Sequence, residues 1–323
     1  MTSIRSLLLQ AQAQLNSAHQ LDAIDARSES QLLLQHVLKV DRAWLIAHEN
    51  DDVAIEAEHE FDTLIQRRIC GEPMAYILGS REFYGLNLTI TPATLIPRPD
   101  TETLVEAALC KIPAHETTQT PSFRRMSESS DFSKNNHQTL DSDLRRNDEV
   151  SVLDLGTGSG AIALAIAVNR PQTNIVAVDA SSAALEVAKI NASALQIPNV
   201  QFLLSNWFSA LAGERFDIIV SNPPYIEAAD SHLKQGDLRF EPLSALASGA
   251  DGLDDIRRII DDCLIHLKPQ GWLMFEHGYN QAESVRDLMA QTGLVAIETL
   301  KDLGGNDRVT IGKNPLIVST HWD

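Results

Sequence analysis

Residues 151–168 read SVLDLGTGSGAIALAIAV. The apolar run at 151–155 is typical of a buried strand, and the apolar stretch at 161–168 is typical of a helix. The glycines between them allow the backbone to turn tightly and allow a ligand to approach it closely. This strand–loop–helix unit predicts the first crossover of a Rossmann-like, doubly wound α/β sheet.

Strand and helix patterns continue to alternate after this unit. We expect further strands at 174–178, 200–204, 216–221 and 272–276, helices at 183–194 and 254–267, and a closing antiparallel pair at 295–300 and 308–311. In an open α/β sheet of this kind, ligands bind at the carboxyl ends of the strands. Polar residues that directly follow a strand are therefore the candidates for function.

The front of the chain has a different pattern. Leucine and isoleucine recur at helical spacing through 1–72, and Asp41 is placed to cap a helix at 42–47. These stripes predict a small helical bundle as a first domain. We expect a linker at 73–113, with a β-hairpin at 81–91 and a helix through Cys110, a polar and disordered insert at 114–149, and the α/β domain at 150–323.

Length, charge and cysteine content limit the class of protein. The 323 residues are enough for two domains, and the net charge of −18 argues against a protein that grips a nucleic-acid backbone. Residues 1–80 carry six Lys or Arg against twelve Asp or Glu. Three scattered cysteines predict a reducing, cytoplasmic location and no metal site. The apolar runs are too short for a membrane span, and the first residues are expected to begin a helix rather than a signal peptide.

The glycine loop and the ends of the following strands predict a cofactor site. Gly156-x-Gly158-x-x-Ala161 also satisfies a dinucleotide fingerprint, so NAD remains an alternative. S-adenosylmethionine is favoured because Asp154 can meet an ammonium group, Asp179 can accept ribose hydroxyls, and nothing resembles a hydride-transfer site. The candidate cofactor-binding residues are Asp154, Gly156, Thr157, Gly158, Ser159, Gly160, Asp179, Asn206, Trp207 and Asn222.

Asn222-Pro223-Pro224-Tyr225 follows the predicted strand 216–221. The prolines hold the turn rigid, the Asn222 oxygen and the Pro223 carbonyl can each accept an N–H, and Tyr225 can pack over a flat group. This corner suits the grip of a planar NH2 group, although an ordinary proline turn is the alternative. The candidate catalytic residues are Asn222, Pro223 and Tyr225, and the candidate substrate-binding residues are Asn222, Pro223, Pro224, Tyr225 and Arg98.

Further motifs lie along the rest of the chain. They are Gly71-Glu72-Pro73, Tyr76-Ile77-x-Gly79, Glu82-Phe83-x-Gly85, Leu95-Ile96-Pro97-Arg98-Pro99, Phe240-Glu241-Pro242, Gly252-Leu253, Glu276-His277-Gly278 and Gly305-Asn306-Asp307-Arg308-Val309. With the glycine loop and the corner, they resemble the HemK/PrmC family of release-factor glutamine methyltransferases. The sequence departs from the family pattern at Asp100, where a glutamate is usual, at Asn206, where an aspartate is common, and in the long insert.

The resemblance implies a class I S-adenosylmethionine-dependent methyltransferase fold behind a small helical domain. It implies N5-methylation of the glutamine in the Gly-Gly-Gln motif of class I peptide-chain release factors, which the front domain would help to hold. We expect a monomer that acts without direct contact to nucleic acid or membrane, and without a metal. Asn222 and the Pro223 carbonyl would accept the two N–H bonds of the substrate amide, while His277 is expected to be structural rather than a base.

Other functions remain open from the sequence. A DNA or RNA adenine methyltransferase would use the same corner on a flipped base, but the acidic front domain and the lack of a basic recognition segment argue against it. A non-catalytic scaffold that binds a release factor is a second alternative. The presence of Asp154, Asp179 and Asn222 together argues against it, because a scaffold would not need all three. An NAD oxidoreductase is the remaining alternative.

Overall fold

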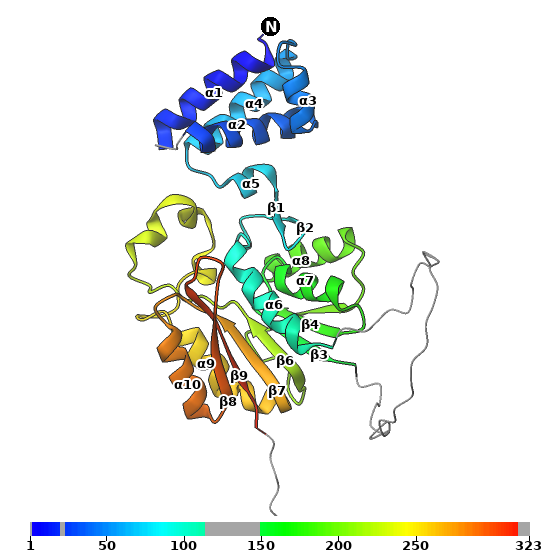
Figure 1. The fold of residues 1–323 in the computed structure, drawn as a ribbon, viewed down its shortest axis with the longest axis vertical. Coiled ribbons are helices and arrows are strands. Elements are labelled where there is room, and N and C mark those ends of the chain that lie inside the picture. Colours follow the sequence, from blue (N-terminus) through cyan, green and yellow to red (C-terminus); the bar gives the residue numbers. More distant parts are fainter. Residues whose placement is uncertain (1, 20–22, 114–148, 316–323) are drawn as a thin grey trace, which may run out of the picture.

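The computed structural model describes residues 2–19, 23–113 and 149–315 (Figure 1). The insert predicted at 114–149 falls outside the described residues, apart from Glu149. None of the described helices is both long and apolar enough to cross a membrane.

The front of the chain forms a helical bundle with its own core. Its helices are α1 (Ile4–His19), α2 (Ala23–Leu38), α3 (Arg42–Ala47) and α4 (Ile55–Ile69). Leu15, Leu33 and Phe61 are fully buried between them, as the helical spacing predicts. Asp41 caps α3 by accepting a bond from the Trp44 N–H at 2.7 Å. Leu32, by contrast, is exposed on α2.

A short connector joins the bundle to the sheet. It consists of α5 (Met74–Leu78), β1 (Ser80–Phe83), β2 (Leu86–Thr89), the 3₁₀ helix η1 (Pro99–Thr101) and α6 (Glu102–Lys111). The predicted hairpin is confirmed: Phe83 pairs with Leu86 across the turn at Tyr84-Gly85. Helix α5, which the sequence analysis did not predict, packs Ile77 into the core of the bundle.

The main sheet of the described residues has seven strands in the order β5-β4-β3-β6-β7-β9-β8 (Figure 1). They are β3 (Ser151–Leu155), β4 (Asn174–Asp179), β5 (Val200–Leu204), β6 (Phe216–Ser221), β7 (Leu267–Glu276), β8 (Val295–Lys301) and β9 (Asp307–Lys313). Strands β3 to β7 are parallel, and β9 runs antiparallel between β7 and β8. The predicted doubly wound sheet and its closing antiparallel pair are therefore confirmed.

Strand β7 begins five residues before the predicted start at Trp272. Pro269 argues against a strand in sequence, but here it lies in an irregular stretch where the pairing with β6 shifts between Phe216 and Ile218. The adjacent Gln270 has a φ of 67°, which marks the same irregularity. An irregularity in the pairing thus accommodates the proline inside the strand.

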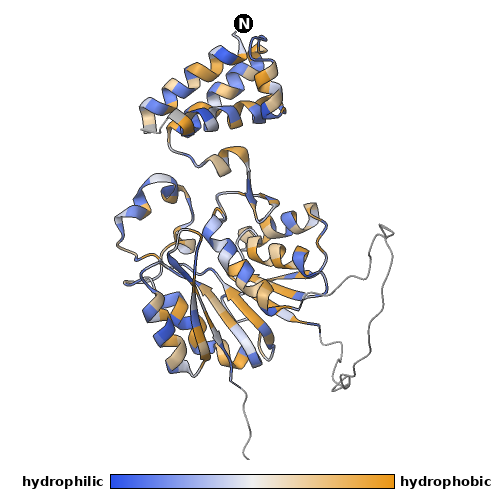
Figure 2. Cartoon of the chain, in the orientation of Figure 1, coloured by the Kyte–Doolittle hydropathy of each residue, from blue (hydrophilic) through white to orange (hydrophobic). Residues whose placement is uncertain are grey.

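Helices cover both faces of the sheet, with α6, α7 (Ala161–Asn169) and α8 (Ser182–Ala194) on one face and α9 (Asp254–His266) and α10 (Ala282–Thr292) on the other. Alternate residues of each strand enter opposite cores: Val152 packs beneath α7, and Leu153 packs beneath α9. Figure 2 shows the hydrophobic residues gathered in α7 and in the central strands. Helix α10 was not predicted from the sequence, because few of its side chains are large and buried.

Candidate active site

The glycine loop lies over a buried carboxyl group. Asp154 is completely buried near the end of β3, where its Oδ2 accepts bonds from the Thr157 hydroxyl at 2.6 Å and the Ala163 N–H at 3.2 Å. Its Oδ1 has no hydrogen-bond partner among the described residues. Burial raises the pKa of Asp154 to about 7, although both hydrogen bonds oppose the rise. The carboxyl group anchors the loop to α7 and still has a free acceptor.

The loop residues differ in what they contact. An added Cβ at Gly156 would lie 3.4 Å from the Trp207 indole, whereas one at Gly158 would meet nothing within 4 Å. Thr157 is buried and its hydroxyl donates to Asp154, and the Ser159 carbonyl accepts a bond from Asn191 at 2.9 Å. At Gly160, an added Cβ would press on side chains of α7 and α8. The open side of the loop is therefore at Gly158.

Asp179 ends β4 beside this loop. Its Oδ2 accepts the Gly158 N–H at 2.9 Å, and its Oδ1 accepts the Ser181 N–H at 2.8 Å. The side chain is half-buried, so each oxygen keeps lone-pair capacity toward the solvent side. The carboxylate is thus held in a fixed position at the carboxyl edge of the sheet.

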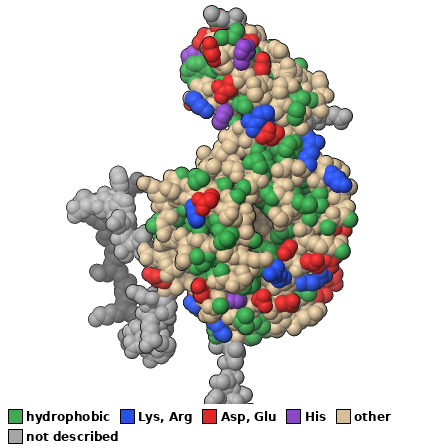
Figure 3. All heavy atoms as spheres, turned by 180° about the vertical axis from the view of Figure 1, so that it is seen from behind, with side chains coloured by type: hydrophobic (Ala, Val, Ile, Leu, Met, Phe, Trp, Pro, Cys, Tyr) green, Lys and Arg blue, Asp and Glu red, His purple; other side chains and the backbone are tan. Residues whose placement is uncertain are grey.

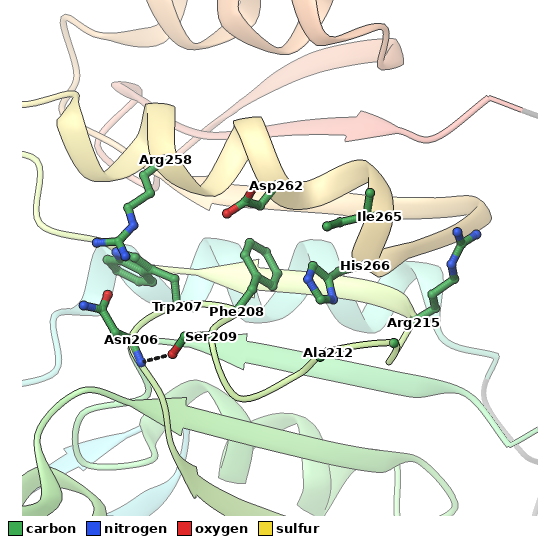
Figure 4. A pocket seen from close by; sticks show the side chains of 11 residues that line it. Asn206, Trp207, Phe208, Ser209, Ala212, Arg215, Arg258, Asp262, Ile265 and His266 are labelled. Atoms are coloured by element: carbon green, nitrogen blue, oxygen red, sulfur yellow. Dashed lines mark hydrogen bonds between the residues drawn. The ribbon is translucent and has the colours of Figure 1, made fainter.

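Asn206 and Trp207 follow β5 and form one end of a large groove (Figure 4). The Trp207 indole N–H donates to Asp255 at 3.3 Å, which holds the ring against the glycine loop. The groove has a volume of about 610 Å³ and runs along α9, past the stacked rings of Phe208 and His266, toward Arg215. Only the end at Asn206 and Trp207 meets the other candidate residues, so most of this groove lies beside the site.

The corner lies next to the glycine loop. Ser221 pairs with Leu155 in parallel register, so Asn222 and Gly156 leave the sheet side by side. The Asn222 Nδ2 donates to the Thr101 hydroxyl at 3.2 Å, and Pro223 and Pro224 are buried. A small cavity of about 60 Å³ opens at the corner. Its lining residues are Leu95, Arg98, Asn222, Tyr225, Ile226, Leu238, Ala245 and Leu246.

Arg98 reaches this cavity and also forms an ion pair with the buried Glu241. Its guanidinium donates to the carboxylate of Glu241, whose Oε2 also accepts the Ile96 N–H at 3.0 Å. Burial raises the pKa of Glu241, and the positive charge of Arg98 opposes this rise. The pair ties the Ile-Pro-Arg-Pro segment to the loop between β6 and α9. This loop contains three short 3₁₀ helices, η2 (Ser231–Lys234), η3 (Gly236–Phe240) and η4 (Leu243–Ala245).

A second buried carboxyl group lies behind the corner. Glu276, at the end of β7, accepts a bond from the Tyr225 hydroxyl at 3.2 Å, while its Oε2 has no hydrogen-bond partner among the described residues. Burial raises the pKa of Glu276 to about 7. Asp100, one of the departures from the family pattern, pairs with Arg308 at 3.2 Å.

His277 is structural, as expected. It is completely buried, with Nδ1 2.9 Å from the Gly278 carbonyl and Nε2 2.8 Å from the Thr310 hydroxyl. Burial lowers the pKa of His277, which favours the neutral ring. In the part of the chain that the structure describes, no three His, Cys, Asp or Glu side chains are grouped to hold a metal ion.

Sequence reasoning missed several residues that hold the site together. Thr101 and Glu241 bond to the predicted residues Asn222 and Arg98, and Asn191 bonds to both the hairpin and the glycine loop. Glu276 lies in the motif Glu276-His277-Gly278, to which the sequence analysis assigns no role. Of these residues, only Glu276 has a signal in the sequence, because it is a polar residue at the end of a predicted strand.

Comparisons with known proteins find matches to both parts of the chain. The chain matches the family model described as Methyltransferase small domain at residues 132–238 and the one described as PrmC N-terminal domain at residues 6–79. The release factor glutamine methyltransferase of Xylella fastidiosa is 47% identical over 90% of this chain and 94% of its own length. Proteins of the same description from Pseudomonas aeruginosa and Escherichia coli are 44% and 42% identical, covering 97% and 89% of this chain and 99% and 92% of their own lengths.

Proposed function

The chain belongs to the family of release factor glutamine methyltransferases, and we propose that it methylates the glutamine of the Gly-Gly-Gln motif in class I peptide-chain release factors, modulating translation termination. The methyl group passes from S-adenosyl-L-methionine to the side-chain amide nitrogen, N5. The geometry of Asn222 supports this reaction best. Its Nδ2 is bound to Thr101, which leaves its Oδ1 to accept an N–H from a substrate at the small cavity.

The residues at the edge of the sheet fit S-adenosyl-L-methionine. Asp154 offers a buried acceptor that has no partner within the described part of the chain, which suits an ammonium group, and Gly158 leaves open space above the loop. Asp179 would accept the ribose hydroxyls, and Asn206 would accept from the adenine amino group beside Trp207. When bound, S-adenosyl-L-methionine supplies a methyl group on a positively charged sulfur, which needs no further activation.

An amide nitrogen is a weak nucleophile because its lone pair is delocalised into the carbonyl group. Asn222 Oδ1 and the Pro223 carbonyl would accept its two N–H bonds and favour the pyramidal nitrogen of the transition state. The Tyr225 ring would pack against the flat amide, and Pro224 would keep the turn rigid. Catalysis then comes mainly from positioning and from the exclusion of water.

Contacts between the bundle and the loop near the cavity support a role of the bundle in holding the release factor. Arg239 donates to the Cys70 carbonyl at 2.8 Å, and Arg68 lies 3.4 Å from Asp237, so η3 is tied to the end of α4. Leu238 of the same 3₁₀ helix lines the small cavity. We assign residues 1–72 to release-factor recognition, 73–113 to the linker and 150–323 to catalysis. Figure 3 shows the narrowing of the molecule between the bundle and the larger catalytic part.

The proposed enzyme acts as a monomer and does not bind nucleic acid. The net charge of −18 would repel a phosphate backbone. On the face drawn in Figure 3, basic side chains are interspersed with acidic ones. The same corner could hold an adenine amino group, so a DNA duplex belongs in the test.

The test is methyl transfer from labelled S-adenosyl-L-methionine to a purified release factor, to its Gly-Gly-Gln variant with alanine in place of glutamine, and to a DNA duplex. Label on the unaltered release factor alone is expected. Asn222→Ala should lower the rate on the order of 100-fold to 1000-fold while cofactor binding, measured by calorimetry, is retained. Asn174→Ala, an exposed asparagine at the start of β4, is the matched control and should keep the rate.

Label on DNA would instead identify an adenine methyltransferase. Cofactor binding with no label on any substrate would contradict the proposed substrate. An unchanged rate in Asn222→Ala would refute the mechanism but leave the substrate assignment intact.

A further inference from the structure

A loop of the catalytic part of the chain is joined to the end of the bundle. In Figure 1 this loop, which lies between β6 and α9 (yellow), extends from the carboxyl edge of the sheet toward the bundle. Arg239 of η3 donates to the carbonyl oxygen of Cys70, the residue that directly follows α4, at 2.8 Å. Arg68, in the last turn of α4, donates to Asp237 of η3 at 3.4 Å. Two residues of η3 therefore contact the end of one bundle helix.

The end of α4 leaves room for the Arg239 guanidinium. The last carbonyl groups of an α-helix have no partner inside the helix, and a positive charge near them is favourable. An added Cβ at Gly71 would lie 1.7 Å from the Arg239 Nη2 atom. Any side chain at position 71 would therefore displace the guanidinium, and the φ of 90° at this position also favours glycine.

The residue between the two contacts lines the substrate cavity. Leu238 lies between Asp237 and Arg239 in η3. It lines the cavity of about 60 Å³ together with Asn222 and Arg98. This volume is small beside ordinary ligand pockets of about 300–1,000 Å³, so a shift of one wall changes how closely the cavity fits a side chain. The apolar side chain of Leu238 suits the methylene groups of a glutamine.

The other end of η3 is fixed to the linker. Glu241 directly follows η3, and its N–H donates to the Leu238 carbonyl at 3.1 Å. The buried carboxylate of Glu241 accepts the Ile96 N–H at 3.0 Å and pairs with Arg98. Leu238 thus lies between contacts with the linker on one side and contacts with the bundle on the other. Because Arg239 is exposed, its removal would release the bundle side and leave the linker side in place.

We propose that Arg239 is a positioning residue, which holds Leu238 against the substrate side chain by linking η3 to the end of α4. This inference rests on the proposed methyl transfer to a glutamine amide at Asn222. It goes beyond a role of the bundle in binding the release factor, because a bundle that fixes one wall of the cavity also contributes to the rate of methyl transfer. A misplacement of about 1 Å in an active site can lower a rate on the order of 100-fold.

Arg239→Ala and Arg239→Lys form the matched pair that tests it. Alanine removes the donor, whereas lysine keeps a positive charge that can donate to a carbonyl oxygen. At saturating release factor and cofactor, we expect kcat to fall on the order of 10-fold in Arg239→Ala and to stay within about threefold of wild type in Arg239→Lys. The dissociation constant of S-adenosyl-L-methionine and the thermal unfolding midpoint should be unchanged in both.

The response of KM and kcat separates positioning from binding. Arg215→Ala, which removes an exposed arginine directly before β6, is the control and should keep both constants. A rise in KM for the release factor with an unchanged kcat in Arg239→Ala would overturn the inference, because Arg239 would then serve binding alone.

Leu238→Ala shows whether Arg239 acts through the wall of the cavity. This substitution should itself lower kcat, since it shortens the wall. In the Leu238→Ala background, Arg239→Ala should lower kcat by less than about twofold, because no leucine side chain is left to position. Losses that multiply in the double variant would overturn the inference, since the two residues would then act independently.

Gly71→Ala displaces the guanidinium from the bundle side. It should lower kcat more in the wild-type background than in the Arg239→Ala background, where the added Cβ meets no guanidinium. The backbone strain at position 71 is common to both backgrounds and cancels, so equal losses would contradict the inference. If Arg239→Ala does not fold, Asp237→Asn, which weakens the second contact with the bundle, takes its place in the comparison with Leu238→Ala.

The two proposals fail in different ways. Wild-type protein that binds the cofactor but does not methylate a release factor would overturn the proposed function, and the inference with it. Active wild type, with Arg239→Ala as fast as wild type, would overturn the inference alone.

Discussion

Asp154→Asn is expected to change the pH dependence of folding in a way that follows from one buried carboxyl group. Asp154 is completely buried, and its Oδ1 has no hydrogen-bond partner among the described residues. Burial raises its pKa from an ordinary value of 3.8 to about 7. An acid whose pKa is raised by folding contributes stability at low pH, and this contribution is lost as the pH rises toward the raised value.

The size of the effect follows from the width of this window. Each pH unit between the two pKa values changes the free energy of unfolding by about 1.4 kcal/mol per group. From about pH 5 to about pH 7, Asp154 should therefore remove about 2 kcal/mol from the stability of the wild type, because the slope declines as the pH nears the raised pKa. Asparagine does not titrate, so the gap between the unfolding free energies should shift by this amount in favour of Asp154→Asn.

Urea unfolding of both proteins at a series of pH values measures this gap. The difference between the two proteins is needed because other buried groups also make stability depend on pH. Glu276, whose pKa is raised, lowers stability as the pH rises, whereas His277, whose pKa is lowered, increases it. Asp217→Asn is the matched control. Burial tends to raise the pKa of Asp217, but bonds from Lys268 and Ser151 bring it below its ordinary value. Its gap should therefore stay constant above about pH 5. A constant gap for Asp154→Asn as well would refute the reasoning.

Two further substitutions test the corner and the bundle. Gly252→Ala would place a Cβ 2.2 Å from the Tyr225 carbonyl at a φ of 74°, and it should lower both stability and methyl transfer. Gly305→Ala is the control, since its φ is 83° and an added Cβ would meet nothing within 4 Å. It should cost only the backbone strain of about 1–2 kcal/mol in thermal unfolding. Equal losses of stability in Gly252→Ala and Gly305→Ala would argue against a clash at the corner. Leu33→Ala should destabilise the bundle by about 2–5 kcal/mol and raise KM for the release factor without weakening cofactor binding. The neighbouring, exposed Leu32→Ala should do neither, and a loss of cofactor binding in Leu33→Ala would contradict separate roles for the two domains.

The positions of the glycine loop and the corner were predictable because they follow from periodicity. Buried strands are recognisable in sequence, and the carboxyl ends of parallel strands share one edge of the sheet. The pairing of Leu155 with Ser221 then brings Gly156 and Asn222 together. Helix α10 was not predicted, because its apolar stripe is weak: its buried residues are only Ala282, Val285 and Met289.

The supporting contacts could not be predicted, because they join residues that no local pattern relates. Thr101 bonds to Asn222 across 121 residues of sequence, and Arg98 pairs with Glu241 across 143. The glycine loop shows a related limit. Its motif suggests one ligand-binding surface, whereas the hydroxyl of Thr157 binds Asp154 and Gly160 serves the packing of α7 against α8. A motif marks where the backbone is constrained, but it does not separate contacts to a ligand from contacts that hold the loop.

The two buried carboxyl groups of the site lie on either side of β6, the strand that ends directly before Asn222. Asp154 is on β3, Glu276 is on β7, and β6 runs between them. Each has one oxygen without a partner among the described residues, and burial raises the pKa of each to about 7. Apolar residues at both positions would make the sheet more stable, because a buried and incompletely bonded carboxyl group opposes folding. Since the proposed cofactor binding needs an acceptor at Asp154, the reduced stability that this carboxyl group causes near neutral pH is a direct consequence of the proposed chemistry.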